Sequence, residues 1–116
     1  MGLPYLEVKI INPAHPQKWT KATFLVDSGA VYTIAPKTLL KRLGIKPHST
    51  KVFTLADGTK IKRRVGDAIF ALNGQKGASP VIFGEKGDSL LFGTVSLGTL
   101  GLILDPIKRE LRPLPM

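Results

Sequence analysis

The segment FLVDSGA, residues 24–30, is the part of this 116-residue sequence from which the rest is best interpreted. Its three large apolar residues predict a buried strand, and Asp27 follows them directly. A carboxylate at the end of a buried strand is costly unless it is hydrogen-bonded or its pKa shifts. By itself, Asp-Ser-Gly is also a common turn that ends a strand. The segment is therefore either a functional site or a turn, and the surrounding sequence has to decide.

The whole sequence has the composition of one small domain. It carries 17 Lys and Arg against 8 Asp and Glu, a net charge of +9, and 43% hydrophobic residues, enough for one core. The longest apolar runs fall far short of the ~18 residues that a bilayer helix needs. Pro4 and Glu7 interrupt the amino terminus, which does not look like a signal peptide. We expect one domain over residues 1–116, a cytoplasmic location and no membrane partner.

Few residues are available for chemistry. The sequence has no cysteine, and His15 and His48 lie far apart without another ligand at metal-binding spacing. Thiol nucleophiles, metal centres and Ser-His-Asp hydrolases need residues that this chain lacks or barely contains. We expect no cofactor and no metal, so that any catalysis depends on carboxylates.

Residues on both sides of the segment predict many short strands and two short helices. Strands are expected at residues 5–11, 19–26, 31–34, 51–55, 59–64, 68–72, 79–83, 90–93, 102–104 and 110–114, and helices at 36–43 and 95–100. Asp57-Gly58 and Asn73-Gly74 predict hairpin turns. This pattern indicates an all-β barrel or sandwich rather than a parallel α/β sheet.

The sequence also contains an internal similarity. Residues 24–29 lead to a helix that closes with Leu43-Gly44, and residues 90–93 lead to a helix that closes with Leu100-Gly101. Each half is expected to send a strand into the middle of the domain and then into a helix. Of these two expected strands, only the one in the first half is followed directly by an acid, Asp27.

In this order along the chain, the motifs resemble the retropepsin-like aspartic proteases, the family of retroviral proteases and their small archaeal and bacterial relatives. Residues 25–30 resemble the family's apolar-apolar-Asp-Thr/Ser-Gly-Ala motif, and residues 55–58 with their flanking strands look like its flap hairpin. Residues 90–93, followed by 100–106, are similar to the carboxy-terminal half of small cellular members. The resemblance implies a closed acid-protease barrel with one lobe per chain.

The resemblance also implies roles for individual residues. Asp27 would be catalytic, Ser28 would hydrogen-bond across a dimer axis, Gly29 would allow close backbone approach, and Ala30 would leave room for substrate. The flap would comprise Leu55, Ala56, Asp57 and Gly58. The apolar substrate-pocket walls would be Leu25, Val31, Ile34 and Leu91, all of which plain core packing explains equally well. The terminal segments, residues 1–5 and 110–116, could pair across the dimer, although Pro113 and Pro115 count against it.

The number of acids then determines the assembly. Aspartic protease chemistry needs two carboxylates that share one proton around a water. The other aspartates, Asp57, Asp67, Asp88 and Asp105, lie in turns or loops unlike the surroundings of Asp27. A twofold homodimer supplies the second carboxylate from a second Asp27. The charged pair that retroviral members carry nearby is absent, because the corresponding positions are Val31 and Thr94.

Three functions remain as hypotheses. The favoured one is a homodimeric aspartic endopeptidase acting on a peptide or protein next to hydrophobic side chains. The second is a catalytically silent retropepsin-fold module for binding or dimerisation. The third is a basic nucleic-acid-binding β domain, which the net charge suggests. Basic clusters such as residues 60–64 are not interleaved with aromatic residues, so nucleic acid is the least favoured partner.

Overall fold

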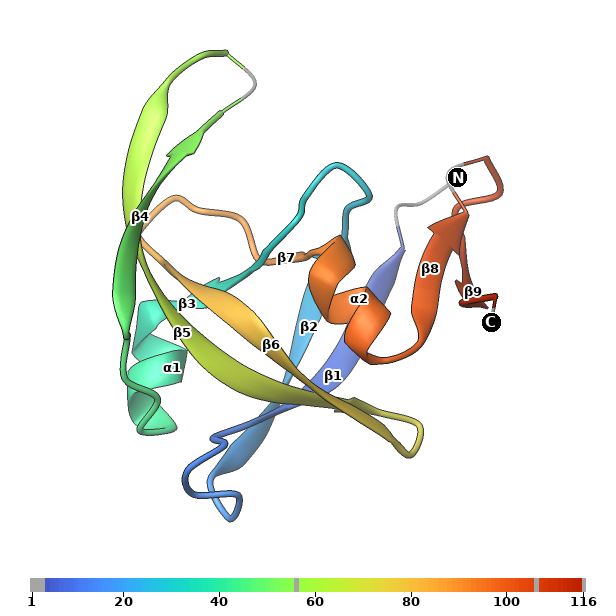
Figure 1. The fold of residues 1–116 in the computed structure, drawn as a ribbon, viewed down its shortest axis with the longest axis horizontal. Coiled ribbons are helices and arrows are strands. Elements are labelled where there is room, and N and C mark those ends of the chain that lie inside the picture. The colour runs from blue at the N-terminus through green and yellow to red at the C-terminus, as the bar shows by residue number, and fades with distance from the viewer. Residues whose placement is uncertain (1–3, 56, 106, 116) are drawn as a thin grey trace.

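The computed structural model describes residues 4–55, 57–105 and 107–115 as a β-rich fold with two short helices (Figure 1). The elements are β1 (Tyr5–Ile11), β2 (Trp19–Val26), β3 (Thr33–Pro36), α1 (Lys37–Arg42), β4 (Ser49–Thr54), β5 (Lys60–Leu72), β6 (Gln75–Gly84), β7 (Leu91–Phe92), α2 (Thr94–Thr99), β8 (Leu102–Asp105) and β9 (Glu110–Pro113). The predicted fold class is confirmed. Within the described ranges no helix is long and apolar enough to cross a membrane.

The main sheet closes on itself. Its strand order is β1-β2-β7-β3-β6-β5-β4, and β1 also pairs with β5. The pairing of Ile11 with Ile69 therefore joins the ends of a ring formed by β1, β2, β7, β3, β6 and β5. This ring agrees with the predicted barrel. Strand β4 lies outside the ring and pairs with β5 alone.

Aromatic residues fill the inside of the ring. Phe24, Phe70 and Phe92 are fully buried, with ring centroids between 5.1 and 6.3 Å apart. They come from β2, β5 and β7, where alternate side chains point into the core. Burying an aromatic side chain contributes roughly 1.5–3 kcal/mol, so this cluster fixes how β2 and β7 pack.

The two similar halves of the sequence meet at the centre of the sheet. β2 and β7 pair in parallel, with Leu25 opposite Leu91 and Val26 opposite Phe92. β7 then runs into α2, which buries Ser96 and Leu97. The predicted arrangement, in which each half sends one strand into the middle, is confirmed. It places the residue after β2, Asp27, beside the end of β7.

Several predicted element boundaries were wrong; for example, the expected strand 79–83 is the longer β6, Gln75–Gly84. The expected strands 59–64 and 68–72 are one 13-residue strand, β5, because Val65 to Asp67 stay in register with β6. Gly66 lies in the middle of this strand, where a Cβ would come within 3.0 Å of the Lys46 carbonyl oxygen and the Phe83 ring. It permits close packing rather than a turn. The expected strand 31–34 starts only at Thr33 and runs to residue 36.

The predicted Asn73-Gly74 turn is confirmed, and the first helix begins one residue later than predicted. Asn73 and Gly74 have φ of 49° and 83° and form the predicted two-residue turn between β5 and β6. Pro36, expected as the first helical residue, is instead the N-cap of α1, with φ −59° and ψ 135°. This extended ψ ends β3 and starts the helix one residue later.

The hairpin of β4 and β5 projects from the barrel as an arm, residues 49–64 (Figure 1). Pairing between β5 and β6 begins at Val65, so the part of β5 before it pairs only with β4. The arm contains the predicted flap. Ala56, part of that prediction, lies outside the described residues.

Candidate active site

Asp27 stands at the end of β2, half-buried, in a short loop that its own carboxylate helps to form. Its Oδ1 accepts the Gly29 amide N–H at 2.8 Å. Its backbone N–H donates to the Phe92 carbonyl at 3.3 Å, and its carbonyl accepts the Ala30 N–H at 3.1 Å. The loop therefore holds one carboxylate oxygen in place. Its second oxygen has no hydrogen bond to any described residue.

The same loop is joined to the start of α2 by main-chain hydrogen bonds. The Thr94 N–H donates to the Ala30 carbonyl at 2.9 Å, and the Val95 N–H donates to the Val31 carbonyl at 3.1 Å. Gly93 makes this approach possible, because a Cβ there would lie 2.5 Å from the Val31 oxygen. Main-chain hydrogen bonds thus join residues 30 and 31 to residues 94 and 95. The side chains of Val31 and Thr94 are uncharged and form no ion pair there.

A buried chain of three side-chain hydroxyl groups lies next to the contact between the Asp27 loop and α2. The Gly93 N–H donates to Thr33 Oγ1 at 3.0 Å, Thr33 Oγ1 lies 2.5 Å from Ser96 Oγ, and Ser96 Oγ lies 2.7 Å from Ser79 Oγ. The Ser79 hydroxyl donates to the Pro80 carbonyl at 3.0 Å. With that bond made, each hydroxyl donates to the next in one direction, and each of these three hydroxyl groups has a partner. Sequence reasoning missed this chain.

A groove of about 320 Å³ runs from the loop that carries Asp27 to the arm. Its lining is mainly apolar: Gly29, Ala30, Val31, Tyr32, Ile34, Phe53, Thr54, Leu55, Ile61, Arg63, Ile82 and Asp88. Of the four expected pocket residues, Val31 and Ile34 lie in this lining. Leu25 and Leu91 instead pair with each other in the sheet and are absent from the lining. Their contact with a substrate stays a prediction.

Among the described residues that line this groove, the only charged side chains form an ion pair that sequence reasoning missed. Arg63 Nε lies 2.8 Å from Asp88 Oδ2, and Arg63 Nη2 lies 3.0 Å from Asp88 Oδ1. The Glu85 N–H also donates to Asp88 Oδ2 at 2.8 Å. These hydrogen bonds, that of Arg63 above all, hold the pKa of Asp88 below its ordinary value against the opposing effect of burial.

The end of the arm has the conformation of a tight turn. The Leu55 N–H donates to the Thr59 carbonyl at 2.7 Å, and Gly58 has φ of 87°. Asp57 Oδ1 accepts the Thr59 N–H at 2.8 Å, and this hydrogen bond lowers the pKa of Asp57. Leu55, 44% exposed, is the expected flap residue that lines the groove.

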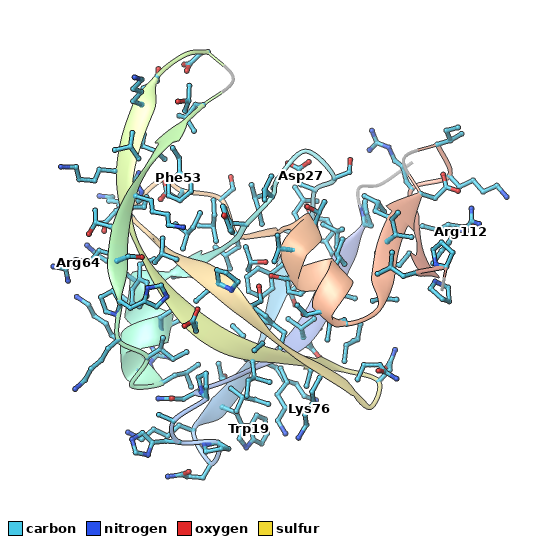
Figure 2. The ribbon with its side chains drawn as sticks, viewed as in Figure 1. Trp19, Asp27, Phe53, Arg64, Lys76 and Arg112 are labelled. Carbon is cyan, nitrogen blue, oxygen red and sulfur yellow. The ribbon has the colours of Figure 1, made fainter. Side chains whose placement is uncertain are left out.

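The sticks in Figure 2 show how the site lies in the molecule. Asp27 is seen between Phe53 on the arm and Arg112 on the carboxy-terminal hairpin, whereas Trp19 and Lys76 lie at the opposite end of the barrel. Among the residues with assigned positions, no three His, Cys, Asp or Glu gather at metal-binding distance. The chemistry open to the site is that of a carboxylate beside an apolar groove.

Comparison with known proteins gives two findings. The family model described as aspartyl protease matches residues 15–94, a span that includes Asp27, the arm and β7. The solution structure of the simian foamy virus (mac) protease is similar, with a TM-score of 0.57 at 23% identity, and the match covers 82% of this chain and 92% of that one. This likeness shows the same fold. The sequence has no match among curated proteins.

Proposed function

The chain belongs to the aspartyl protease family, and on that premise we propose that two copies form one endopeptidase in which the two Asp27 carboxylates meet across a twofold axis. Membership of the family indicates a peptidase. The identity of the catalytic residue, the homodimer and the role of the arm as a flap are the parts that we propose.

One observation carries the proposal: Asp27 keeps one carboxylate oxygen on the Gly29 N–H and leaves the other without a partner among the described residues. The free oxygen belongs to a loop that borders an apolar groove. Among the described residues that line the groove, the one carboxylate, that of Asp88, is occupied by Arg63 and the Glu85 N–H. The second acid for the reaction therefore comes from the second copy.

The chemistry needs only these two carboxylates and a water. One Asp27 takes a proton from the water, whose oxygen attacks the peptide carbonyl carbon. The other Asp27 donates its proton to the carbonyl oxygen, and a tetrahedral diol forms. When the C–N bond breaks, the protonated carboxyl gives its proton to the leaving nitrogen and the other carboxylate takes a proton from a hydroxyl of the diol, so that an amine and a carboxylic acid form and the pair again shares one proton.

A second hollow, of about 410 Å³, suits the dimer contact. It is lined by Ser28, Thr94, Leu97, Gly98, Leu102, Ile103, Leu104 and Leu114. Ile103 is 46% exposed and Leu114 37%, an apolar area continuous with Ser28, the neighbour of Asp27. A second copy that covered this surface would remove the area from water and bring the two loops together.

The carboxy-terminal strand differs from the expectation for this contact. Glu110–Pro113 forms β9, which pairs with β8 of the same chain, and the Leu114 N–H donates to the Gly101 carbonyl at 2.8 Å. Pairing of residues 110–116 across the dimer must therefore use the outer edge of this hairpin. Within the described chain, both β8 and β9 have one edge without a strand partner.

The groove determines the proposed substrate class. An extended peptide would place a hydrophobic side chain against Val31 and Ile34, and the arm would cover it from the other side with Leu55. Arm backbone groups would add hydrogen bonds in the manner of an extra strand and exclude water.

Cleavage of a peptide library tests this function. Purified protein would be incubated with proteome-derived peptides from about pH 3 to 7 and the products read by mass spectrometry. We expect cuts beside hydrophobic residues that Asp27→Asn abolishes. Asp67→Asn is the matched control, because Asp67 is exposed and faces His48 away from the groove. A folded wild-type protein that cuts nothing would contradict the proposal and leave a silent binding module. Equal cutting by Asp27→Asn would contradict it by showing that Asp27 is not the catalytic residue.

A further inference from the structure

The arm leaves the barrel at Val65, and few contacts hold it over the groove. β4 pairs only with β5, so apart from β5 itself no strand of the ring pairs with the arm. Two close side-chain contacts join the arm to the rest of the described chain, and a longer one, from Lys51 Nζ on β4 to the centroid of the Tyr32 ring at 5.7 Å, adds to the second. One is the ion pair of Arg63, on β5, with Asp88. The other is the ring of Phe53, on β4, which meets the ring of Tyr32 edge to face, with centroids 6.0 Å apart.

The ion pair is built more firmly than an ordinary surface pair. It is bidentate, and both side chains are only 17% exposed. Asp88 is fixed from its other side by the Glu85 N–H, so the guanidinium is held against a defined loop. Two parallel N–H···O bonds fix orientation as well as distance. Shielding from solvent also reduces screening by salt.

Both contacts end on segments that frame Asp27. Tyr32 directly follows Val31, whose carbonyl accepts the Val95 N–H, and its own backbone carbon lies against Gly93. Asp88 precedes the residues that enter β7, and β7 pairs with β2 beside Asp27. The arm is therefore attached, one strand at each point, to the parts of the chain that position the reacting carboxylate.

We propose that the Arg63–Asp88 ion pair and the Phe53–Tyr32 contact form a two-point anchor that sets the angle of the arm over the groove. The anchor determines how tightly a bound peptide is enclosed beside Asp27. Arg63, Asp88, Phe53 and Tyr32 are positioning residues rather than catalytic ones. The effect on cleavage rests on the proposed function, whereas the anchoring itself is a property of the fold.

Two contacts near the point where the arm leaves the barrel matter because the arm extends well beyond them. Residues 59–63 span about 13 Å at the ordinary rise of a strand, so a small rotation at Arg63 moves the end of the arm several times further than the root. One contact on each strand opposes both hinging and twisting of the hairpin. Loss of the ion pair leaves only the contacts of β4 with Tyr32, and loss of the Phe53 ring leaves the ion pair and the longer Lys51 contact. Either loss should let the arm open more easily.

Hydrogen exchange measures this opening without any substrate. Arg63→Met removes the ion pair, and Phe53→Leu removes the aromatic contact. Arg64→Met is the matched control, because Arg64 is the next residue on the same strand, points to the other face (Figure 2) and makes no ion pair with a described residue. We expect amides of residues 49–64 to exchange about tenfold faster in the first two variants, with the amides of β1 and β2 unchanged.

Peptide cleavage gives the second readout. We expect Arg63→Met to raise KM about tenfold with kcat nearly unchanged, because enclosure of the peptide changes and the carboxylates do not. Asp88→Asn should act on the same contact, so the double variant should be no worse than Arg63→Met alone. Additive effects in the double variant would contradict a shared contact.

The outcomes separate the anchor from the proposed function. Unchanged exchange in the arm, or equal acceleration in the arm and in β1 and β2, would overturn the anchor. Faster exchange confined to the arm supports it even if the wild-type protein cleaves no peptide. In that last case the proposed peptidase function fails and the anchor stands.

Discussion

The loop that carries Asp27 and the arm border one groove, but different kinds of contact hold them. Main-chain hydrogen bonds from Thr94 and Val95, with a close approach at Gly93, fix the loop that carries Asp27. Side chains hold the arm, through Arg63 and Phe53. A reacting group has to stay in place, whereas a flap has to open for each substrate. The difference suggests that rigidity and mobility in this fold are divided between backbone and side-chain contacts.

The largest loss of stability should come from a substitution that disturbs the main-chain contacts of the loop that carries Asp27. Gly93→Ala would place a Cβ 2.5 Å from the Val31 carbonyl oxygen, and backbone on both sides would have to move. We expect a loss of about 3 kcal/mol in the free energy of unfolding, measured by urea denaturation, together with loss of peptide cleavage.

Gly98→Ala is the control for that change. Gly98 lies in α2, and a Cβ there meets nothing within 4 Å. Alanine in a helix interior should raise the stability by about 0.5–1 kcal/mol. Equal stability of the two variants would show that the close approach at Gly93 is not needed.

A smaller loss of stability should follow from removing one of the buried hydroxyl groups next to the Asp27 loop. Thr33→Val keeps the side-chain volume but leaves the buried Gly93 N–H without an acceptor and ends the chain to Ser96. The expected cost is about 2 kcal/mol in the free energy of unfolding. Thr23→Val, on an exposed part of β2, should change it by less than about 0.5 kcal/mol. A Thr33 variant as stable as the Thr23 variant would count against a supporting role for the hydroxyl chain.

The smallest effect on stability concerns the side-chain contacts of the arm, and it depends on pH. Because Arg63 holds the pKa of Asp88 below its ordinary value, the ionised carboxylate stabilises the folded state above about pH 4. This contribution is lost as pH falls through the lowered pKa in the folded protein. The stability difference between wild type and Asp88→Asn should therefore shrink between about pH 5 and pH 2 in urea unfolding series. A difference that stays constant over this range would contradict the assigned cause.

Local patterns in the sequence predicted most of the framework. Period-two alternation in residues 5–11 identified β1, and Asn73-Gly74 identified a turn whose positive φ values few other residues adopt. The repeated order of strand and helix predicted that β2 and β7 lie together. In each case the decisive information lies within a few neighbouring residues. Gly66 lies in the gap between the two expected strands 59–64 and 68–72, and a glycine needed for close packing has the same sequence signature as one in a turn.

The surroundings of Asp27 were only partly predictable. The segment of residues 24–30 singled out the acid, and Val31 and Ile34 do line the groove beside it. The partners Arg63 and Asp88 are 25 positions apart, and the hydroxyls of Thr33 and Ser96 are 63 apart. Such pairs depend on how β5, β3 and α2 pack together, and a single sequence carries no local signal for them. A polar residue at an inward-facing strand position, such as Thr33, is the one hint that the sequence offered.

The central claim is that one site needs Asp27 from two chains, and a mixing experiment tests it most directly. Wild-type protein would be unfolded and refolded with an equal amount of Asp27→Asn, and its cleavage compared with that of the same amount of wild type refolded alone. Random pairing puts half of the wild-type chains into mixed dimers, so activity should fall to about half. Excess Asp27→Asn should lower it further. Activity that stays unchanged at every ratio would mean that one chain cleaves alone, which would contradict the account.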